Sequence, residues 1–177
     1  PYITEKAILG NGQTQRGAVL TAIDPQAESG VSNLRGAMIA GDLDSLHGDG
    51  FNVVLGTTLA DILRVVPGDY VQVTVPRLTV TPLGMFPRSK RLRVTGIFQI
   101  GAQPDAYQAY ISLTTGQKLL GSKGSVDGLQ VKTRDLFTAP DVMRALAAEL
   151  PDTYVVKDWS QTQGSLFRAV KLEKVMV

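Results

Sequence analysis

The stretch Tyr70-Val71-Gln72-Val73-Thr74-Val75 alternates polar and apolar side chains, so its three valines share one face. Residues 91–98, Arg91-Leu92-Arg93-Val94-Thr95-Gly96-Ile97-Phe98, place Leu92, Val94 and Phe98 on one face in the same way. Such alternation is typical of a β-strand with one buried face. The two segments are therefore predicted to be strands and neighbours in an antiparallel sheet.

Further strands are expected where the chain alternates or forms a short apolar run bounded by turn residues. These segments are residues 17–23, 51–55, 107–113, 128–132 and 153–156. Residues 10–17 are rich in glycine but lack the Lys-Ser/Thr pair of a phosphate-binding P-loop. They predict a turn between two strands.

Two helices are predicted before the C-terminal segment. Thr57 or Thr58 can cap a helix that reaches Leu63 and stops before the turn residues 67–69. A second helix is expected over residues 140–150, with Thr138 as its cap. Its apolar stripe repeats every four residues and consists of Val142, Leu146 and Leu150. Strand, helix and strand over residues 128–156 predict a compact β-α-β unit.

The two ends of the sequence suggest a fragment of a longer protein. The chain opens on Pro1 and contains no run of 18 apolar residues, which predicts a soluble piece. Residues 166–177 have a helical pattern without a terminating cap, so this helix is expected to continue. The length of 177 residues fits one domain or two small lobes.

Charge is distributed unevenly along a chain whose net charge is only +2. Residues 70–104 contain no acidic side chain but hold five basic ones: Arg77, Arg88, Lys90, Arg91 and Arg93. This basic segment indicates either a binding surface for something acidic or a solvated strand face.

The connection between the two opening strands, residues 76–90, is much longer than an ordinary hairpin loop. It is stiffened by prolines and contains apolar side chains, which a disordered linker lacks: Leu78, Val80, Leu83, Met85 and Phe86. One interpretation is that these side chains fold back onto the core. The other is a projecting arm with an apolar tip at residues 83–86 over a basic base, suited to an apolar groove on a protein partner.

Signals for catalysis or metal binding are weak. The chain has no cysteine, which excludes disulfide scaffolds, zinc ribbons and thiol catalysis. The single histidine, His47, has no nucleophile elbow near it and is expected to be an exposed loop residue. Asp42, Asp44 and Asp49 suggest calcium, but Leu46 and Val53 stand where an EF-hand needs oxygen ligands. Nucleic-acid binding is disfavoured because aromatic residues make up 6% of the chain and no recognition motif is present.

Three blocks of sequence resemble one known family. The first runs from Gly56-x-x-Leu59-Ala60-x-x-Leu63 through Pro67-Gly68-Asp69 to Pro76. The second is Thr81-Pro82-Leu83-Gly84-Met85-Phe86-Pro87 with the basic strand after it, and the third is residues 158–174. Together they resemble the periplasmic domain of LolC/LolE permeases, which belong to the lipoprotein-releasing ABC transporter and to the MacB-like superfamily.

The resemblance implies an α+β fold with two lobes. A β-α-β Porter-like lobe would combine residues 1–32 with residues 122–160. An inserted, mostly antiparallel Sabre-like lobe would span residues 33–121 and carry a hook arm at residues 76–90. Residues 161–177 would form a stalk leading toward a transmembrane helix.

The resemblance also implies a function at the periplasmic face of the bacterial inner membrane. Such permeases work with a LolD-type ATPase and a second permease subunit, release lipoproteins from the membrane and pass them to the carrier LolA. The domain itself would be non-catalytic and would need neither cofactor nor metal. The alternatives are a MacB-like efflux permease contacting an adaptor protein and, from another class, a small hydrolase using His47.

The family's docking residues fall on named positions of this sequence. The expected hook residues are Pro76, Val80, Thr81, Pro82, Leu83, Gly84, Met85, Phe86 and Pro87, with Leu83 at the tip. The expected pad at its base comprises Gln72, Ser89 and Lys90, beside the basic-strand residues Arg88 and Arg91. LolC carries arginines in this pad, whereas Gln72 and the shorter Lys90 lack the guanidinium fork.

Overall fold

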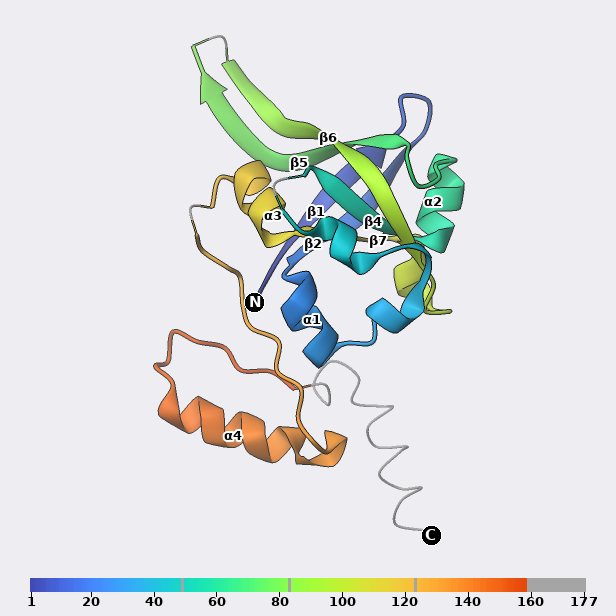
Figure 1. Cartoon of the computed structure of the whole chain (residues 1–177). Helices are drawn as coiled ribbons and strands as arrows, with labels where there is room; N and C mark the ends of the chain where they lie inside the picture. The colour runs from blue at the N-terminus through green and yellow to red at the C-terminus, as the bar shows by residue number, and fades with distance from the viewer. Residues whose placement is uncertain (49, 83, 123, 159–177) are drawn as a thin grey trace. The chain divides into compact units, whose positions relative to one another are not determined.

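The computed structural model describes residues 1–48, 50–82, 84–122 and 124–158. Within these ranges, residues 79–81 are described by their backbone alone. The chain divides into two compact units, Pro1–Gln130 and Val131–Val177. The first unit contains every strand of the described chain, shown from blue to yellow in Figure 1. The second contains the helix α4.

The first unit is built on a mixed seven-stranded sheet. Its strands are β1 (Tyr2–Gly10), β2 (Gln15–Ile23), β3 (Met38–Gly41), β4 (Asn52–Gly56), β5 (Tyr70–Thr81), β6 (Gly84–Phe98) and β7 (Gln108–Ser112). They lie in the order β3-β6-β4-β7-β2-β1-β5, and β5 also pairs with β6. This extra pairing closes six strands into a ring, because β6 is bonded to β4 on one side and to β5 on the other. Only β3 stands outside the ring, paired with β6.

Helices occupy the connections between strands, so the predicted α+β class is confirmed. The α-helices are α1 (Pro25–Val31), α2 (Thr57–Leu63), α3 (Leu113–Leu120) and α4 (Ala139–Glu149). Short 3-10 helices are η1 (Arg35–Ala37), η2 (Leu43–Leu46), η3 (Gln103–Ala106) and η4 (Leu136–Thr138).

The alternating segments form the strands predicted from them. Tyr70 pairs with Arg93 and Val73 with Lys90 in an antiparallel ladder. Val71, Val73 and Val75 are fully buried and join Leu92 and Val94 in the main core inside the ring. A second, smaller core lies around Phe98, whose ring meets Tyr110 edge to face with centroids 5.5 Å apart. The prediction that Phe98 shares a face with Leu92 and Val94 is therefore wrong, because the register against β4 shifts between Val94 and Gly96 and reverses the alternation. The strands expected near residues 17–23, 51–55 and 107–113 are also confirmed as β2, β4 and β7.

Some predicted elements differ in the structure. Helix α2 does begin at Thr57, but Gly56 occupies the N-cap position and no side chain caps the helix. Residues 129–132 and 153–156 are not strands; only Gly128 forms an isolated bridge, to Tyr2. The predicted β-α-β unit is therefore wrong in its strands and right in its helix, α4. Isolated four- or five-residue apolar runs form strands only where a partner strand supplies hydrogen bonds.

The two-lobe division stays a prediction. Strands β1 and β2, which precede residue 33, share one sheet with β3–β7, so the sheet itself marks no boundary there. The helix predicted over residues 166–177 and the stalk lie outside the described residues. None of the helices in the described ranges combines the length and apolar character that crossing a membrane requires.

Candidate partner-binding surface

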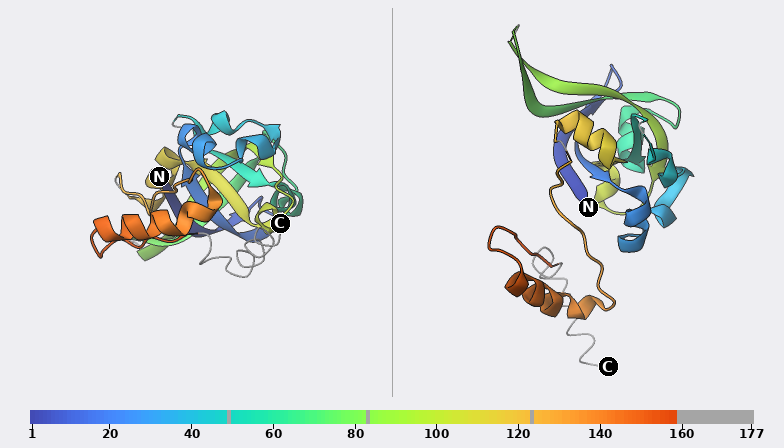
Figure 2. Two further views of the ribbon diagram at one scale, coloured as in Figure 1. Left: turned by 90° about the horizontal axis from the view of Figure 1, so that it is seen from below. Right: turned by 60° about the vertical axis from the view of Figure 1, so that its left-hand side comes forward.

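The hairpin of β5 and β6 extends beyond the ring as an arm, seen at the top of Figure 1 and in the right view of Figure 2. At its end the backbone of Thr81 pairs with that of Gly84, and this is the last pair of the ladder. Leu78, Met85 and Phe86 are exposed to 55%, 65% and 51% of their surface. These side chains do not fold back onto the core, so the interpretation as a projecting arm holds for them. The predicted tip residue Leu83 lies outside the described residues.

Other predicted hook residues fit the same arm. Pro76, Pro82, Gly84 and Pro87 are all exposed. The backbone of Val80 pairs with that of Met85, which places Val80 near the end of the arm. The hook residues with described side chains are therefore presented together to solvent.

A break in the ladder separates the arm from its base. Val75 pairs with Arg88 and Leu78 pairs with Pro87, so Pro76 and Arg77 form a bulge between them. Pro76 suits this position because proline has no N–H to donate to a ladder. Arg77 Nε donates to the Glu5 carboxylate on β1 at 3.0 Å, which ties the bulge to the ring.

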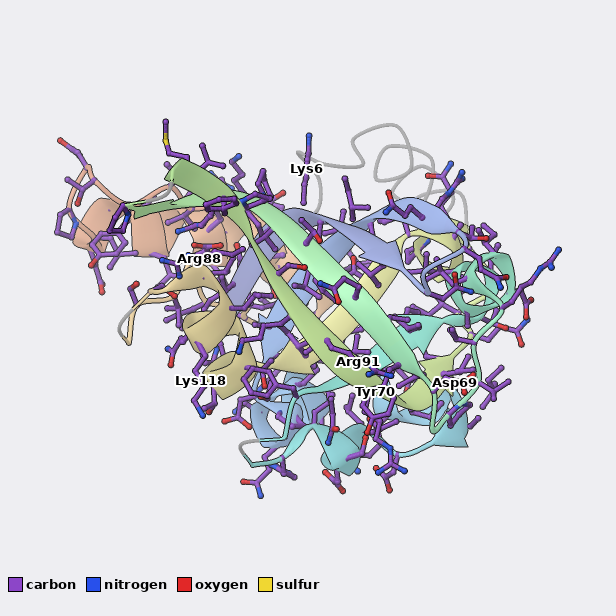
Figure 3. The ribbon with its side chains drawn as sticks, turned by 90° about the horizontal axis from the view of Figure 1, so that it is seen from above. Lys6, Asp69, Tyr70, Arg88, Arg91 and Lys118 are labelled. Atoms are coloured by element: carbon purple, nitrogen blue, oxygen red, sulfur yellow. The ribbon has the colours of Figure 1, made fainter. Side chains whose placement is uncertain are left out.

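At the base, the β5–β6 ladder has two faces of different chemistry. We call its solvent side the outer face; it carries Tyr70, Gln72, Thr74, Ser89 and Arg91. The Gln72 amide donates to Ser89 Oγ, and Thr74 Oγ1 lies 2.9 Å from the same oxygen. The Arg91 guanidinium lies over the Tyr70 ring at 4.4 Å from the centroid, as the two labelled side chains in Figure 3 show. This stacking holds the arginine flat against the strand.

The predicted pad residue Lys90 and the basic-strand residue Arg88 lie on the other face. The side chains of Arg88 and Lys90 share the side of β6 that buries Leu92. Arg88 Nη1 donates to the Leu119 carbonyl at 3.5 Å, and its guanidinium packs against Gly121 at the end of α3. Lys90 Nζ lies 5.1 Å from the Phe51 ring centroid. The predicted base therefore consists of two surfaces. Gln72, Ser89 and Arg91 lie on the outer face, and Arg88 and Lys90 lie on the opposite face of the ladder.

The outer face continues into a groove of about 430 Å³ beside the turn between β1 and β2. The residues added by this turn and by β1 and β2 are Ile8, Gly10, Asn11, Gly12 and Gln15. Sequence reasoning missed them as surface residues, although it predicted the turn correctly. Asn11 shapes the turn: its Oδ1 accepts from Gln13 N and Thr14 N, and its Nδ2 donates to the Leu63 carbonyl at 2.5 Å. A single polar residue such as Asn11 in a turn does not indicate from the sequence that a groove lies beside it.

His47 has a structural partner. Its Nε2 lies 3.3 Å from the Asp44 carboxylate, which also accepts two hydrogen bonds from the Arg35 guanidinium, at 2.6 and 2.8 Å. Hydrogen bonding to Arg35 lowers the pKa of Asp44, and the same bond raises the pKa of Arg35. Among the described residues, no three acidic or histidine side chains gather into a group that could hold a metal ion.

Comparison with known proteins fits this geometry. The model of the MacB-like periplasmic core domain matches residues 1–149, so the chain belongs to that family. Over its whole length the chain is 35% identical to "Lipoprotein-releasing system transmembrane protein LolC" of Xylella fastidiosa (strain 9a5c) and 33% identical to the protein of that name from Neisseria meningitidis. It is 21% identical to a LolE protein of Haemophilus influenzae. The predicted resemblance to LolC/LolE proteins is confirmed.

The relatives are longer proteins. The chain spans 43% of the length of the LolC proteins from Xylella and Neisseria. Among solved structures, the extracellular domain of the noncanonic ABC-type transporter YknZ from Gram-positive bacteria superposes with a TM-score of 0.51 at 14% identity. That match covers 89% of this chain and 75% of the other, and it supports the fold.

Proposed function

We propose that this chain is the periplasmic domain of an inner-membrane ABC transporter permease of the LolC/LolE type, and that its β5–β6 arm docks the carrier protein LolA. The observation that carries the proposal is the arm itself, with three exposed apolar side chains at Leu78, Met85 and Phe86. The names of the relatives, which describe a lipoprotein-releasing system, support the substrate class.

The chemistry of the arm fits insertion into an apolar groove on the partner. Docking through the arm costs little backbone conformational entropy, because the backbone of the hairpin is already ordered by its strand pairing. Burying such side chains is favourable at about 25 cal/mol per Å² of apolar surface. The outer face then supplies hydrogen-bond donors beside the inserted arm, from Gln72 and from Arg91.

In this proposal the domain is non-catalytic, and the energy for transport comes from ATP hydrolysis in a separate subunit. A LolD-type ATPase would hydrolyse ATP in the cytoplasm, and a second permease subunit would complete the membrane part. The lipoprotein would leave the periplasmic face of the inner membrane and pass to LolA at the arm.

The test is isothermal titration calorimetry of this chain against LolA from the same organism. We expect saturable binding that falls at least tenfold in Met85→Glu, because a carboxylate entering an apolar groove loses its hydration. Ile39→Glu is the matched control: Ile39 is 57% exposed and lies on β3, outside the arm. Equal affinity of Met85→Glu and the unmodified chain would refute docking through the arm. Absence of binding by the unmodified chain would favour a LolE-like role on the lipoprotein side or another ABC permease, such as an efflux permease that contacts an adaptor protein.

A further inference from the structure

A second hollow lies on another part of the ring, on the outward side of β1, β2 and β7. It has a volume of about 310 Å³. Its floor follows the strand register, since Tyr2 pairs with Ile23, Thr4 with Thr21, and Thr21 with Tyr110. Glu28 of helix α1 and Ser32, which follows the helix, form one wall, and Gln130 completes the lining. We call this hollow the Glu28 pocket.

Glu28 is placed in the wall by the cap of α1. Asp24 Oδ1 accepts from Gln26 N at 3.0 Å and Ala27 N at 3.4 Å, and Pro25 fits the first helical position. This short helix buries only Pro25 and Glu28. A glutamate on a helix that is otherwise largely exposed could have faced solvent, yet here it faces the strands.

The Glu28 side chain is in an unusual state for a carboxylate. The residue is only 9% exposed. Within the described parts of the chain, its carboxylate has neither a hydrogen-bond donor nor a cationic partner. Among those residues, Ser122 Oγ is the one side-chain oxygen or nitrogen that is fully buried and has no hydrogen-bond partner. The Glu28 oxygens have no partner either, so they are not fully buried and remain accessible from the pocket that Glu28 lines. A largely buried and unpaired carboxylate is costly unless something compensates its charge.

The rest of the lining supplies no positive charge. Its other members are neutral: Tyr2, Thr4, Thr21, Ile23, Ser32, Tyr110 and Gln130. A charged group bonded to the lining is also acidic, because Asp127 accepts from Thr4 N at 2.8 Å. Burial, followed by the charge of Glu28, raises the pKa of Tyr110 to about 12, so this phenol stays neutral and can donate a hydrogen bond. The pocket therefore combines one anion with hydroxyl groups and two aromatic rings.

This combination suits an organic cation better than a metal ion. A metal ion needs several oxygen or nitrogen ligands, and the described residues contain no group of three acidic or histidine side chains. An ammonium or guanidinium group instead pairs with one carboxylate and gains from tyrosine rings. A hollow of about 310 Å³ accepts a lysine or arginine side chain and is small for a folded segment.

We propose that the Glu28 pocket binds a single lysine or arginine side chain presented by a protein partner, with the Glu28 carboxylate as its counter-ion. This site is separate from the arm and does not depend on the proposed docking of LolA. Free amines share the chemistry of a lysine side chain, so the experiment below distinguishes the two sources.

The test is an NMR titration of this chain, labelled with ¹³C on its glutamate carboxyl groups and tyrosine rings, in phosphate buffer without amines. The probes are Nα-acetyl-lysine methylamide, Nα-acetyl-arginine methylamide, the neutral norleucine analogue and putrescine. We expect the capped lysine or arginine to shift the Glu28 carboxyl and Tyr110 ring signals saturably, and at least tenfold more tightly than norleucine. Equal binding of norleucine, or shifts confined to other residues, would overturn the proposal. Binding of putrescine but of neither capped residue would overturn the assignment to a protein side chain.

Two variants complete the experiment. Glu28→Gln keeps the shape of the side chain and removes its charge, and we expect it to lose at least tenfold in affinity. Glu149→Gln is the matched control, because Glu149 is exposed on α4 and lines no part of the pocket. Thermal unfolding tests whether the variant is folded. We expect the melting temperature of Glu28→Gln to equal or exceed that of the unmodified chain, because the substitution removes an unpaired buried charge. Retained affinity in Glu28→Gln would overturn the proposal.

Discussion

Arg88 and Arg91 lie three residues apart on β6, and their positions show how one strand serves two purposes. Arg91 stacks on Tyr70 on the solvent side, whereas Arg88 reaches the carbonyl of Leu119 at the end of α3. In Figure 3 the two labelled side chains lie on different parts of the hairpin. The basic segment found in the sequence is therefore not a single charged patch.

The two arginines are expected to respond differently to substitution. Arg91→Ala should weaken LolA binding two- to fivefold, about 0.4–1 kcal/mol, and reduce its salt dependence, because the removed charge is exposed at the docking face. Arg88→Ala should leave affinity unchanged and lower stability by about 0.3–1 kcal/mol, because a cation at a helix C-terminus is lost. Calorimetry at two salt concentrations and urea unfolding measure both. The reverse pattern would contradict the division of the pad.

At the scale of elements, the start of α2 explains one block of the family resemblance. A Cβ atom added to Gly56 would lie 2.4 Å from the Asp105 carbonyl oxygen. Glycine is required there because the end of β4 packs directly on η3, where Asp105 accepts hydrogen bonds from Ile100 N and Gly101 N, both at 2.8 Å. The requirement for glycine at position 56 therefore comes from its close contact with the Asp105 backbone and not from a turn conformation.

Gly56→Ala should therefore lower the free energy of unfolding by roughly 1–3 kcal/mol, the usual cost of an overpacked site. The control is Gly17→Ala on β2, where a Cβ atom meets nothing within 4 Å. There stability should stay equal or rise by up to about 1 kcal/mol, since alanine restricts the unfolded chain. Urea unfolding compares the two, and similar losses would mean that the space beside Gly56 is not limiting.

Elements were predictable from sequence where one face is buried in an ordinary ladder. The valines of β5 and the residues Leu92 and Val94 of β6 specify their strands by alternation, whereas the register shift after Val94 that moves Phe98 to the other core leaves no local pattern. Helix α3 was missed because Gly116 weakens its helical pattern, and only the structure shows that this glycine allows Ala22 to approach. Helix α1 was missed although Asp24-Pro25 is a readable start signal. The strands predicted near residues 130 and 155 did not form, because within the described ranges no strand pairs along either segment.

For the whole molecule, the candidate site was predictable in part. The length and apolar character of residues 76–90 predicted the arm, because a disordered linker is polar and lacks such apolar side chains. The division of the pad and the groove beside Asn11 depend on which strands are neighbours. Strand β1 pairs directly with β5, although the two are far apart in the sequence. Contacts between distant segments of this kind leave no local pattern in a sequence.

The ring is expected to be independent of the arm. Replacing residues 76–87 by Asn-Gly should leave a folded protein, because Val75 and Arg88 already pair and a two-residue turn joins such positions. Only the Arg77–Glu5 contact is lost from the ring among the interactions described above. We expect a melting temperature within about 5 °C of the unmodified chain and no LolA binding. Loss of folding would show that the arm stabilises the ring.

The three prolines of the arm have a consequence for solubility. Beyond the bulge, β5 and β6 pair with each other and with no other strand of the described chain, so each presents an unpaired edge next to apolar side chains. An edge of this kind invites other chains to add strands and aggregate. Pro76, Pro82 and Pro87 remove N–H donors from the arm, and the bulge interrupts its outline. In the proposed function the arm therefore binds one partner while being a poor template for amyloid-like growth.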